Sequence, residues 1–277
     1  MSKLCFFILV FLTAVSCKNN AESVLKNELF GKVKFITVET YKAELDFDQF
    51  KRGSKVSEEL KKYDRNGNII ELKEFDSTQR LSHLLKYEYD KHDRMLKWTR
   101  FDQSMQIEAV EKINYVSSDL REFVSLQKDG SQQSFTTEER EQKSDKWIQK
   151  FYSGRDLLST TYNTYDKNEN LIFRQKMKDG LVEEEERNVY LNKKVIESTT
   201  EYPRNGSKMI LKNLFDSLGN ITSTKIWNNN SLTYNMENRY SSFDLHQNWI
   251  EKIEIPLLMP RSFQIKPNIV QRKISYY

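Results

Sequence analysis

The chain has 277 residues, with 44 Lys and Arg against 40 Asp and Glu, and charged residues make up 30% of it. Acidic and basic side chains are interleaved rather than gathered into a basic patch or stripe, so the composition argues against nucleic-acid binding. A hydrophobic share of 38% in a chain of this length is enough for a folded core without disulfides.

The first 17 residues have the pattern of a bacterial export signal. Lys3 provides a positive charge, residues 4–15 form an apolar run, and small residues at 14–16 precede Cys17. The run is too short to cross a bilayer, for which about 20 residues are needed. A Cys directly after the small residues resembles the lipobox of bacterial lipoproteins, which predicts cleavage before Cys17 and its acylation. The alternative is an ordinary secretory leader with an incidental Cys.

Acylation, with palmitate or a similar chain, would hold the mature protein on a membrane of the bacterial cell envelope, facing the periplasm or the outside. Residues 18–30 are then a polar tether, in which only residues 21–30 show a trace of helical periodicity. The second cysteine, Cys5, lies inside the leader. The mature chain is therefore predicted to have no internal disulfide, thiol nucleophile or thiolate metal site.

Residues 31–277 are the predicted folded domain, and a short motif recurs in them seven times. Each copy has an aromatic residue, then Asp, four turn-like residues and an apolar residue. Gaps of 12, 14, 12, 64, 50 and 28 residues are close to multiples of about 13, and such a period indicates a repeat architecture. The copies begin at Tyr63-Asp64, Phe75-Asp76, Tyr89-Asp90, Phe101-Asp102, Tyr165-Asp166, Phe215-Asp216 and Phe243-Asp244, and their apolar partners are Ile69, Leu81, Met95, Ile107, Leu171, Ile221 and Trp249.

Each copy predicts a tight turn between two strands. Asp at the first position of a type I turn accepts a backbone N–H two residues on, and Gly at the fourth position can take positive φ. A type I turn followed by such a residue is a common hairpin loop. Only Gly67 and Gly219 supply that glycine, so we expect the other turns to be strained or of another type. Their residues at this position are Gln79, Asp93, Met105, Glu169 and Gln247.

Between the turns, apolar and polar residues alternate with period two, as in half-buried strands. The sequence therefore predicts an all-β fold, a long antiparallel β-meander of about fifteen hairpin-connected strands that curls so that its apolar faces pack on each other. A break or sharp change of direction is expected in the weakly repeating residues 116–145. A proline-containing loop at 256–267 is expected to precede a last strand at 270–277. The side chains predicted inside are Leu81, Leu85, Tyr87, Leu232 and Tyr234.

The Tyr-Asp-x-x-Gly-Asn spacing of the first copy resembles the YD (RHS-type) repeat, in particular short bacterial lipoproteins of unknown function that carry it. The likeness extends from about Gly31 onwards. Gly31-Lys32-Val33-Lys34 is similar to their opening segment, and Asn248-Trp249 and Arg272-Lys273-Ile274-Ser275-Tyr276 are similar to their closing strands. Residues 115–162 depart most from the pattern. This resemblance implies an architecture and a location, and it is nearly silent on chemistry.

The sequence predicts no catalytic residue, metal or cofactor. His83, His92 and His246 have no metal-ligand spacing, and the Gly-x-Ser-x-Gly signature of serine hydrolases is absent. Asp64 and Asp166 begin segments like the start of a calcium loop. That loop needs Glu at its twelfth position, where this chain has Phe or Met. We therefore interpret these Asp residues, like those of the other copies, as turn-forming.

Aromatic side chains are the most plausible binding surface, although most should fill cross-strand pairs. The first to consider are Trp98, Trp147, Trp227 and Trp249. Exposed sheet edges offer another route, capture of an extended partner strand. The function predicted is a non-enzymatic envelope lipoprotein with a binding or structural surface for a protein or polysaccharide partner. The alternatives are a hydrolase of envelope polymers and a partner-specific assembly or immunity protein.

Overall fold

A computed structural model describes residues 29–141, 144–258 and 266–277. Cys17 and the leader lie outside these ranges, as do residues 18–28, which make up most of the tether and of the short helical segment considered at 21–30. No membrane-spanning helix occurs among the described residues. The strands are β1 (Val33–Asp46), β2 (Gln49–Tyr63), β3 (Ile69–Phe75), β4 (Leu81–Tyr89), β5 (Met95–Phe101), β6 (Ile107–Tyr115), β7 (Leu120–Leu126), β8 (Gln132–Arg140), β9 (Lys146–Ser153), β10 (Asp156–Tyr165), β11 (Leu171–Lys178), β12 (Leu181–Leu191), β13 (Lys194–Tyr202), β14 (Ser207–Phe215), β15 (Ile221–Asn228), β16 (Ser231–Phe243), β17 (Trp249–Leu258) and β18 (Asn268–Tyr276).

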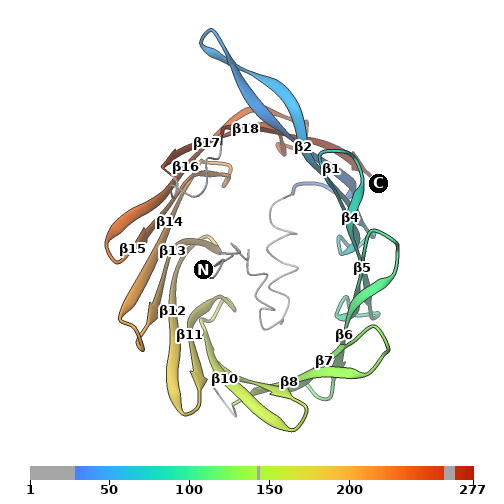
Figure 1. Cartoon of the computed structure of the whole chain (residues 1–277), viewed down its shortest axis with the longest axis vertical. Helices are drawn as coiled ribbons and strands as arrows, with labels where there is room; N and C mark the ends of the chain where they lie inside the picture. The colour runs from blue at the N-terminus through green and yellow to red at the C-terminus, as the bar shows by residue number, and fades with distance from the viewer. Residues whose placement is uncertain (1–28, 142–143, 259–265) are drawn as a thin grey trace, which may run out of the picture.

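The strands form one 18-stranded antiparallel sheet that closes into a barrel (Figure 1). Each strand pairs with the next one along the chain, and β1 also pairs with β18, from Val33 opposite Tyr276 to Lys42 opposite Asn268. The predicted all-β meander of hairpins is thus confirmed, and the weakly repeating regions also form hairpins. Closure leaves the ring without the free edges that the sequence had suggested for strand capture.

Residues 116–145 do not break the sheet. The strands β7 and β8 from this region pair with each other and with β6 and β9 on either side. The ring is elongated, and its lower end in Figure 1 is formed by β7, β8 and β10. The region therefore lies where the ring turns back, while its ladder of backbone hydrogen bonds continues. Regular hairpins persist there because alternation, rather than the turn motif, is what a strand requires.

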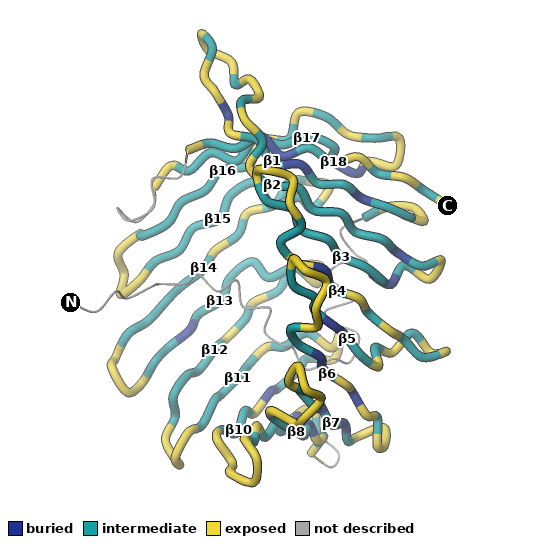
Figure 2. The backbone as a smooth tube through the Cα atoms, turned by 45° about the vertical axis from the view of Figure 1, so that its right-hand side comes forward, coloured by how far each residue is buried: buried dark blue, intermediate teal, exposed yellow. Residues whose placement is uncertain are grey.

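The sequence predicted that apolar faces of the curled sheet would pack on each other. The sheet is instead a single curled layer in which the buried residues are few and scattered (Figure 2). Leu84 is the most buried apolar side chain of β4, on the face opposite Leu85. Leu232 is 37% exposed, so its predicted inward position is wrong. A register shift places Leu232 opposite Trp227 but Tyr234 opposite Ile226, so the two side chains point to opposite faces. The other predicted inward residues, Leu81, Leu85, Tyr87 and Tyr234, are half-buried.

The principal apolar cluster lies where the ring closes. Val33, Ile36, Tyr63 and Ile69 are buried together at the junction of β1, β2 and β3. Side chains from β4 and β18, including Tyr87 and Ile274, pack against this group. Burial raises the pKa of Tyr87 to about 12. The hydrophobic contribution to closure is therefore concentrated at one seam.

The proline-containing segment is only in part a loop. Pro256 lies within β17, opposite Met236 of β16, and the last strand begins at Asn268. Proline lacks an amide hydrogen and is tolerated where one side of a strand needs no donor. The ladder between β17 and β18 ends at the pair Glu254 and Asn268, so Pro256 lies beyond it. The middle of the expected loop, 259–265, is outside the described residues.

All seven motif copies adopt one turn. In each, the Asp amide donates to the carbonyl four residues on, and the amide of the fourth turn residue donates to the Asp carbonyl, at 2.9–3.2 Å. The fourth residue is left-handed everywhere, with φ of 81° and 88° at the two glycines and 60–64° at the five other residues. Of the two outcomes expected for the turns without glycine, the structure shows strain and not a different turn type. Five copies place an unfavourable residue in the same conformation.

Replacing Gly67 with Val should lower stability by about 1 kcal/mol or more, because a β-branched residue is strained at φ of 88°. The reverse change, Met105→Gly, should leave stability unchanged or increase it, because it removes strain from an equivalent position. Urea unfolding of both variants measures the two effects. Equal stability of Gly67→Val and the parent would contradict the strain argument. Gly219→Val is a less clean control, because its added Cβ would press on the Lys194 ammonium group.

Candidate functional site

The turn-forming Asp side chains are structural ligands of the backbone. The Asp64 carboxylate accepts the amides of Asn66 and Asn68 at 2.9 Å, and its counterparts in the other copies bind their turns similarly. Hydrogen bonds from Thr78 and from the Arg80 amide lower the pKa of Asp76 to about 2. These residues lie in separate hairpin turns around the barrel and do not converge on one site. The carboxylate of each of the other six accepts a backbone amide two or four residues on, and these residues are Asp76, Asp90, Asp102, Asp166, Asp216 and Asp244.

Four tyrosine hydroxyls each donate a hydrogen bond to a backbone carbonyl of the neighbouring strand, just beyond the last paired residues of the two strands. The pairing of β3 with β4 ends at Glu71, and the Tyr89 hydroxyl then donates to the Ile69 carbonyl at 2.8 Å. Each acceptor is the apolar residue that follows a motif turn, and each tyrosine is 19 or 20 residues further on. The sequence interpretation missed this spacing, although it is readable. The other pairs are Tyr115 with Met95, Tyr190 with Leu171 and Tyr240 with Ile221.

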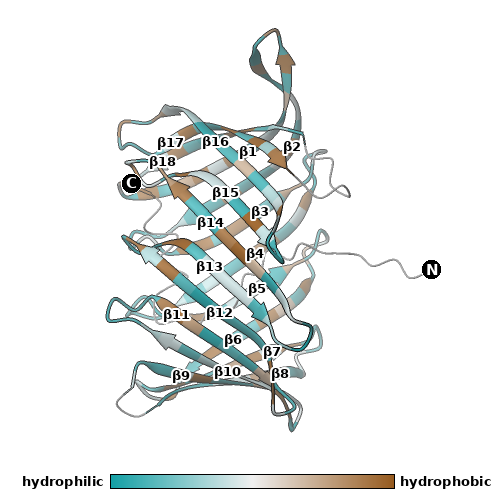
Figure 3. Cartoon of the chain, turned by 90° about the vertical axis from the view of Figure 1, so that its left-hand side faces the viewer, coloured by the Kyte–Doolittle hydropathy of each residue, from teal (hydrophilic) through white to brown (hydrophobic). Residues whose placement is uncertain are grey.

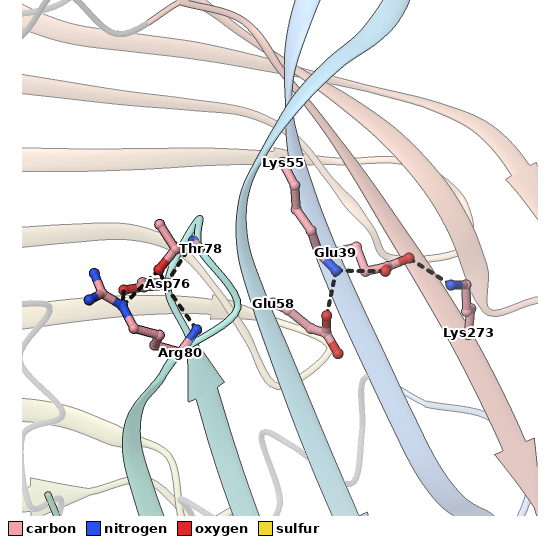
Figure 4. A network of polar contacts seen from close by, with 7 residues as sticks. All are labelled: Glu39, Lys55, Glu58, Asp76, Thr78, Arg80 and Lys273. Atoms are coloured by element: carbon pink, nitrogen blue, oxygen red, sulfur yellow. Dashed lines mark hydrogen bonds and ion pairs between the residues drawn. The ribbon is translucent and has the colours of Figure 1, made fainter. Parts of the chain in front are cut away.

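A network of charges crosses the closing seam (Figure 4). Glu39 of β1 contacts Lys55 of β2 at 2.9 Å and Lys273 of β18 at 2.8 Å, and Lys55 also binds Glu58. Hydrogen bonds from Lys273 and then Lys55 lower the pKa of Glu39 to about 2, while Glu58 is the largest cause of the raised pKa of Lys55. The network ties the first strand to both neighbours.

Acid should weaken this seam between about pH 4.5 and pH 2. The Glu39 pKa is about 2 in the folded chain against 4.5 for a free carboxyl, so its stabilisation is complete above pH 4.5 and is lost as pH falls through 2. We expect Glu39→Gln to cost about 1–3 kcal/mol at pH 6 and much less at pH 2.5, a range discounted for the exposure of Lys273. Unfolding of both chains at the two pH values measures this difference. A cost that does not change with pH would contradict it.

A second charged pair is fully buried in the strands at the end of the ring. Arg121 of β7 and Glu138 of β8 approach to 2.7 Å, and their side chains are 4% and 0% exposed. The Arg121 guanidinium also lies over the Trp147 ring of β9, 4.9 Å from its centroid. Three adjacent strands are thus joined by one buried cation. This pair lacks an opening to solvent, so we interpret it as part of the fold.

The tryptophans divide into buried and accessible ones. Trp147 and Trp249 are buried, and Arg272 lies over the Trp249 ring at 3.5 Å. Trp98 is half-buried and donates to Glu111 at 2.9 Å. Trp227 is also half-buried, and it lines a surface depression of about 310 Å³. It is therefore the tryptophan placed to meet a ligand.

The depression lies between β14 and β15 and the turn that follows. Ile210 and Lys212 of β14 line it with Trp227 of β15 and Asn230. The exposed Leu232 is paired with Trp227 and extends the same face. An aromatic face beside an ammonium and an amide can stack on a flat ligand while donating hydrogen bonds to it.

The histidines do not meet at a site. His83 is 4.0 Å from Glu108, His92 lies in a turn, and His246 packs on the Tyr276 ring with centroids 4.2 Å apart. Within the described ranges, no three His, Cys, Asp or Glu side chains are grouped to hold a metal ion. The charged groups described above instead pair across strands or bind turns.

Comparison with known proteins gives weak likenesses in structure. No family model matches the chain, and no curated protein matches it. A porin-like protein from Bacteroides uniformis aligns with 89% of this chain and 99% of its own, at 10% identity and a TM-score of 0.42. The Tc holotoxin pore of Photorhabdus luminescens aligns with 70% of this chain at 12% identity and a TM-score of 0.20, and this chain spans 14% of its length. The TcdB2-TccC3-Cdc42 structure is similar at 10% identity and a TM-score of 0.21.

Proposed function

We propose that this protein is a non-enzymatic lipoprotein of the bacterial envelope whose barrel offers a binding surface. The leader and Cys17 support the location. The commitment of ionisable groups to turns and cross-strand pairs supports a role without catalysis, since a general acid needs a raised carboxyl pKa whereas those of Glu39 and Asp76 are lowered. The resemblance to YD-repeat lipoproteins agrees with this reading.

We place the barrel in water beside the membrane, held there by the lipid. Both faces of the sheet carry charge in mid-strand: Arg174 contacts Glu186 at 2.7 Å on one face, and Arg187 contacts Glu185 at 2.9 Å on the other. Hydrophilic and hydrophobic residues are mixed along the strands (Figure 3). A lipid-facing sheet surface favours a continuous apolar band instead, and charge at its middle costs about 2–4 kcal/mol.

The observation that carries the binding role is the depression at Trp227. Its aromatic face, the Lys212 ammonium and the Asn230 amide suit a sugar ring or a peptide side chain, so the partner is a polysaccharide or a protein of the envelope. The depression is open to solvent, which suits a segment of an extended polymer. Lys212 also contacts Glu197 at 2.9 Å, so its ammonium is held beside the ring.

Affinity capture with the mature barrel tests this function. The barrel is incubated with envelope extract and culture supernatant, and the retained protein and saccharide are identified. Retention should fall at least about tenfold for Trp227→Ala, as for an aromatic anchor. Trp98→Phe is the matched control, because Trp98 is also half-buried but lies on β5, away from the depression. Equal retention by Trp227→Ala and the parent would contradict a binding role for this site.

Acylation of Cys17 gives a separate prediction about location. Cys17→Ser should move the protein from the membrane fraction to the soluble periplasm or the medium, because neither a thioether-linked lipid nor an acylated N-terminus can then form. Membrane fractionation and mass measurement of the mature N-terminus test this result. Unchanged membrane association, or recovery of an uncleaved 277-residue chain, would contradict lipid anchoring.

A further inference from the structure

One hairpin projects from the ring (Figure 1). Beyond Lys42, β1 leaves its ladder with β18, and β2 begins to pair with β3 only at Glu58. The segment between these points is a two-stranded ribbon whose strands pair with each other, from Ala43 opposite Arg52 to Asp46 opposite Gln49. At its base, the Ala43 amide donates to the Pro267 carbonyl and Arg52 donates to Gln271, both at 2.8 Å, whereas residues 44–51 stand clear of the sheet that closes the barrel.

The tip of the ribbon carries apolar side chains in solvent. Phe47 is 93% exposed and Leu45 is 68% exposed, and Leu45 lies opposite Phe50. Exposure of a phenylalanine to water is unfavourable, because burial of its side chain would lower the free energy by about 1.5–3 kcal/mol. A large aromatic side chain at a projecting tip is placed to enter a pocket of a partner, as aromatic anchors do in protein interfaces.

The backbone at the same residue is also unfavourable. Phe47 has φ of 53°, a left-handed conformation that hairpin turns normally give to Gly, Asn or Asp. An aromatic residue there costs about 1 kcal/mol. The five motif turns without glycine carry strain of the same kind, so Phe47 is distinguished from them by the exposure of its side chain at a projecting tip.

Charge around the tip selects the partner. Asp46 and Asp48 flank Phe47, with Glu44 behind them. Of the two cations of the ribbon, Lys51 is paired with Asp46, and Arg52 donates to Gln271 of β18 at the base, at 2.8 Å. Carboxylates beside the aromatic ring disfavour insertion into a bilayer with an anionic surface. They complement a pocket that is apolar at its centre and basic at its rim.

We propose that the β1–β2 ribbon docks Phe47 into an apolar pocket with a basic rim on a protein partner in the envelope. This interaction lies outside the Trp227 depression and does not depend on it. The base of the ribbon is joined to the ring by the ion pairs of Glu39 with Lys55 and Lys273. The exposed tip then becomes the centre of the interface.

Site-specific photocrosslinking in cells tests the proposal with the full chain. A benzoylphenylalanine probe replaces Phe47 in one strain and Leu245 in the control strain, since Leu245 is a fully exposed apolar residue of another turn. A protein adduct should form from position 47 and not from 245. Asp48→Lys should reduce its yield at least about fivefold, since it reverses one of the charges that face the basic rim.

Phe47→Gly distinguishes docking from folding. Glycine adopts positive φ without strain, so this variant should melt at the same temperature as the parent or higher. Its affinity for the crosslinked partner should nevertheless fall at least about tenfold. Loss of Trp227 should leave the adduct intact. Adducts with lipid alone or with a second copy of this chain, equal adducts at 245, or insensitivity to Asp48→Lys would each overturn the proposal.

Discussion

Neutralising Glu138 should destabilise the barrel by about 3–5 kcal/mol. Glu138→Gln keeps the shape of the side chain but leaves the Arg121 guanidinium charged, buried and without its counter-ion. Removing one member of a buried ion pair has this cost because the desolvation of the remaining charge is no longer offset. Urea unfolding measures the change. A loss below about 1 kcal/mol would show that water reaches the pair.

Removing both charges together should cost far less. In the double variant Arg121→Met, Glu138→Leu, apolar groups replace the pair, and such replacements are commonly neutral or stabilising. A double-mutant cycle with each single change isolates the coupling between the two side chains. Stacking of Arg121 on Trp147 is lost in both the single and the double Arg121 variants, so it cancels in the cycle to first order. Additive losses would mean that the two residues act independently.

The local part of the fold was predictable, because the information for it is contained in neighbouring residues. Asp64 and the six equivalent residues set the turns, and alternation set the strands between them. The sequence left open whether the turns without glycine share this conformation, because residues such as Met105 do not favour φ of 60° in isolation. They adopt it because the Asp carboxylate and the flanking ladder fix the remaining hydrogen bonds, so tertiary context overrides local preference.

The face of the sheet to which each side chain points was less predictable, because all seven motif turns and several others are flanked by a register shift. One such shift reversed the predicted side of Leu232 relative to Tyr234. Closure also depends on contacts more than 200 residues apart, such as those of Glu39 with Lys273 and of Phe30 with Asn248 at 2.7 Å. No period in the sequence records such pairs. The alternation of apolar and polar residues predicts the strands of a meander. Whether the sheet stays open or closes into a ring depends on whether its first and last strands pair.

The candidate site was only partly accessible from the sequence. The sequence offered four tryptophans as candidate ligand contacts and gave no reason to prefer one. Trp227 is distinguished only in the structure, where the following turn places Asn230 beside it in the depression. The buried pair of Arg121 and Glu138 lies in the region that resembles the repeat least. Its two residues look like solvated strand charges until the register places them opposite each other. The tyrosine spacing, by contrast, was present in the sequence and is a usable signal.

Deleting β18 should have the largest effect of all, because this strand closes the ring. Residues 268–276 pair with both β1 and β17, and their side chains contribute Arg272 over Trp249 and Lys273 on Glu39. Without them, β1 and β17 become long unpaired edges, which promote aggregation. A chain ending at residue 266 should therefore lose its cooperative unfolding transition and elute as oligomers or aggregate in size-exclusion chromatography.

Shortening the projecting ribbon is the matched control for this deletion. Replacing residues 43–52 with an Asn-Gly turn removes a similar length of chain but leaves the ring pairs from Val33 to Lys42 in place. This variant should remain monomeric and melt cooperatively. The informative comparison is between two losses of similar length, one from the seam and one outside it. A monomeric, cooperatively melting chain after loss of β18 would contradict the argument, and it would require β1 and β17 to join directly as a parallel pair.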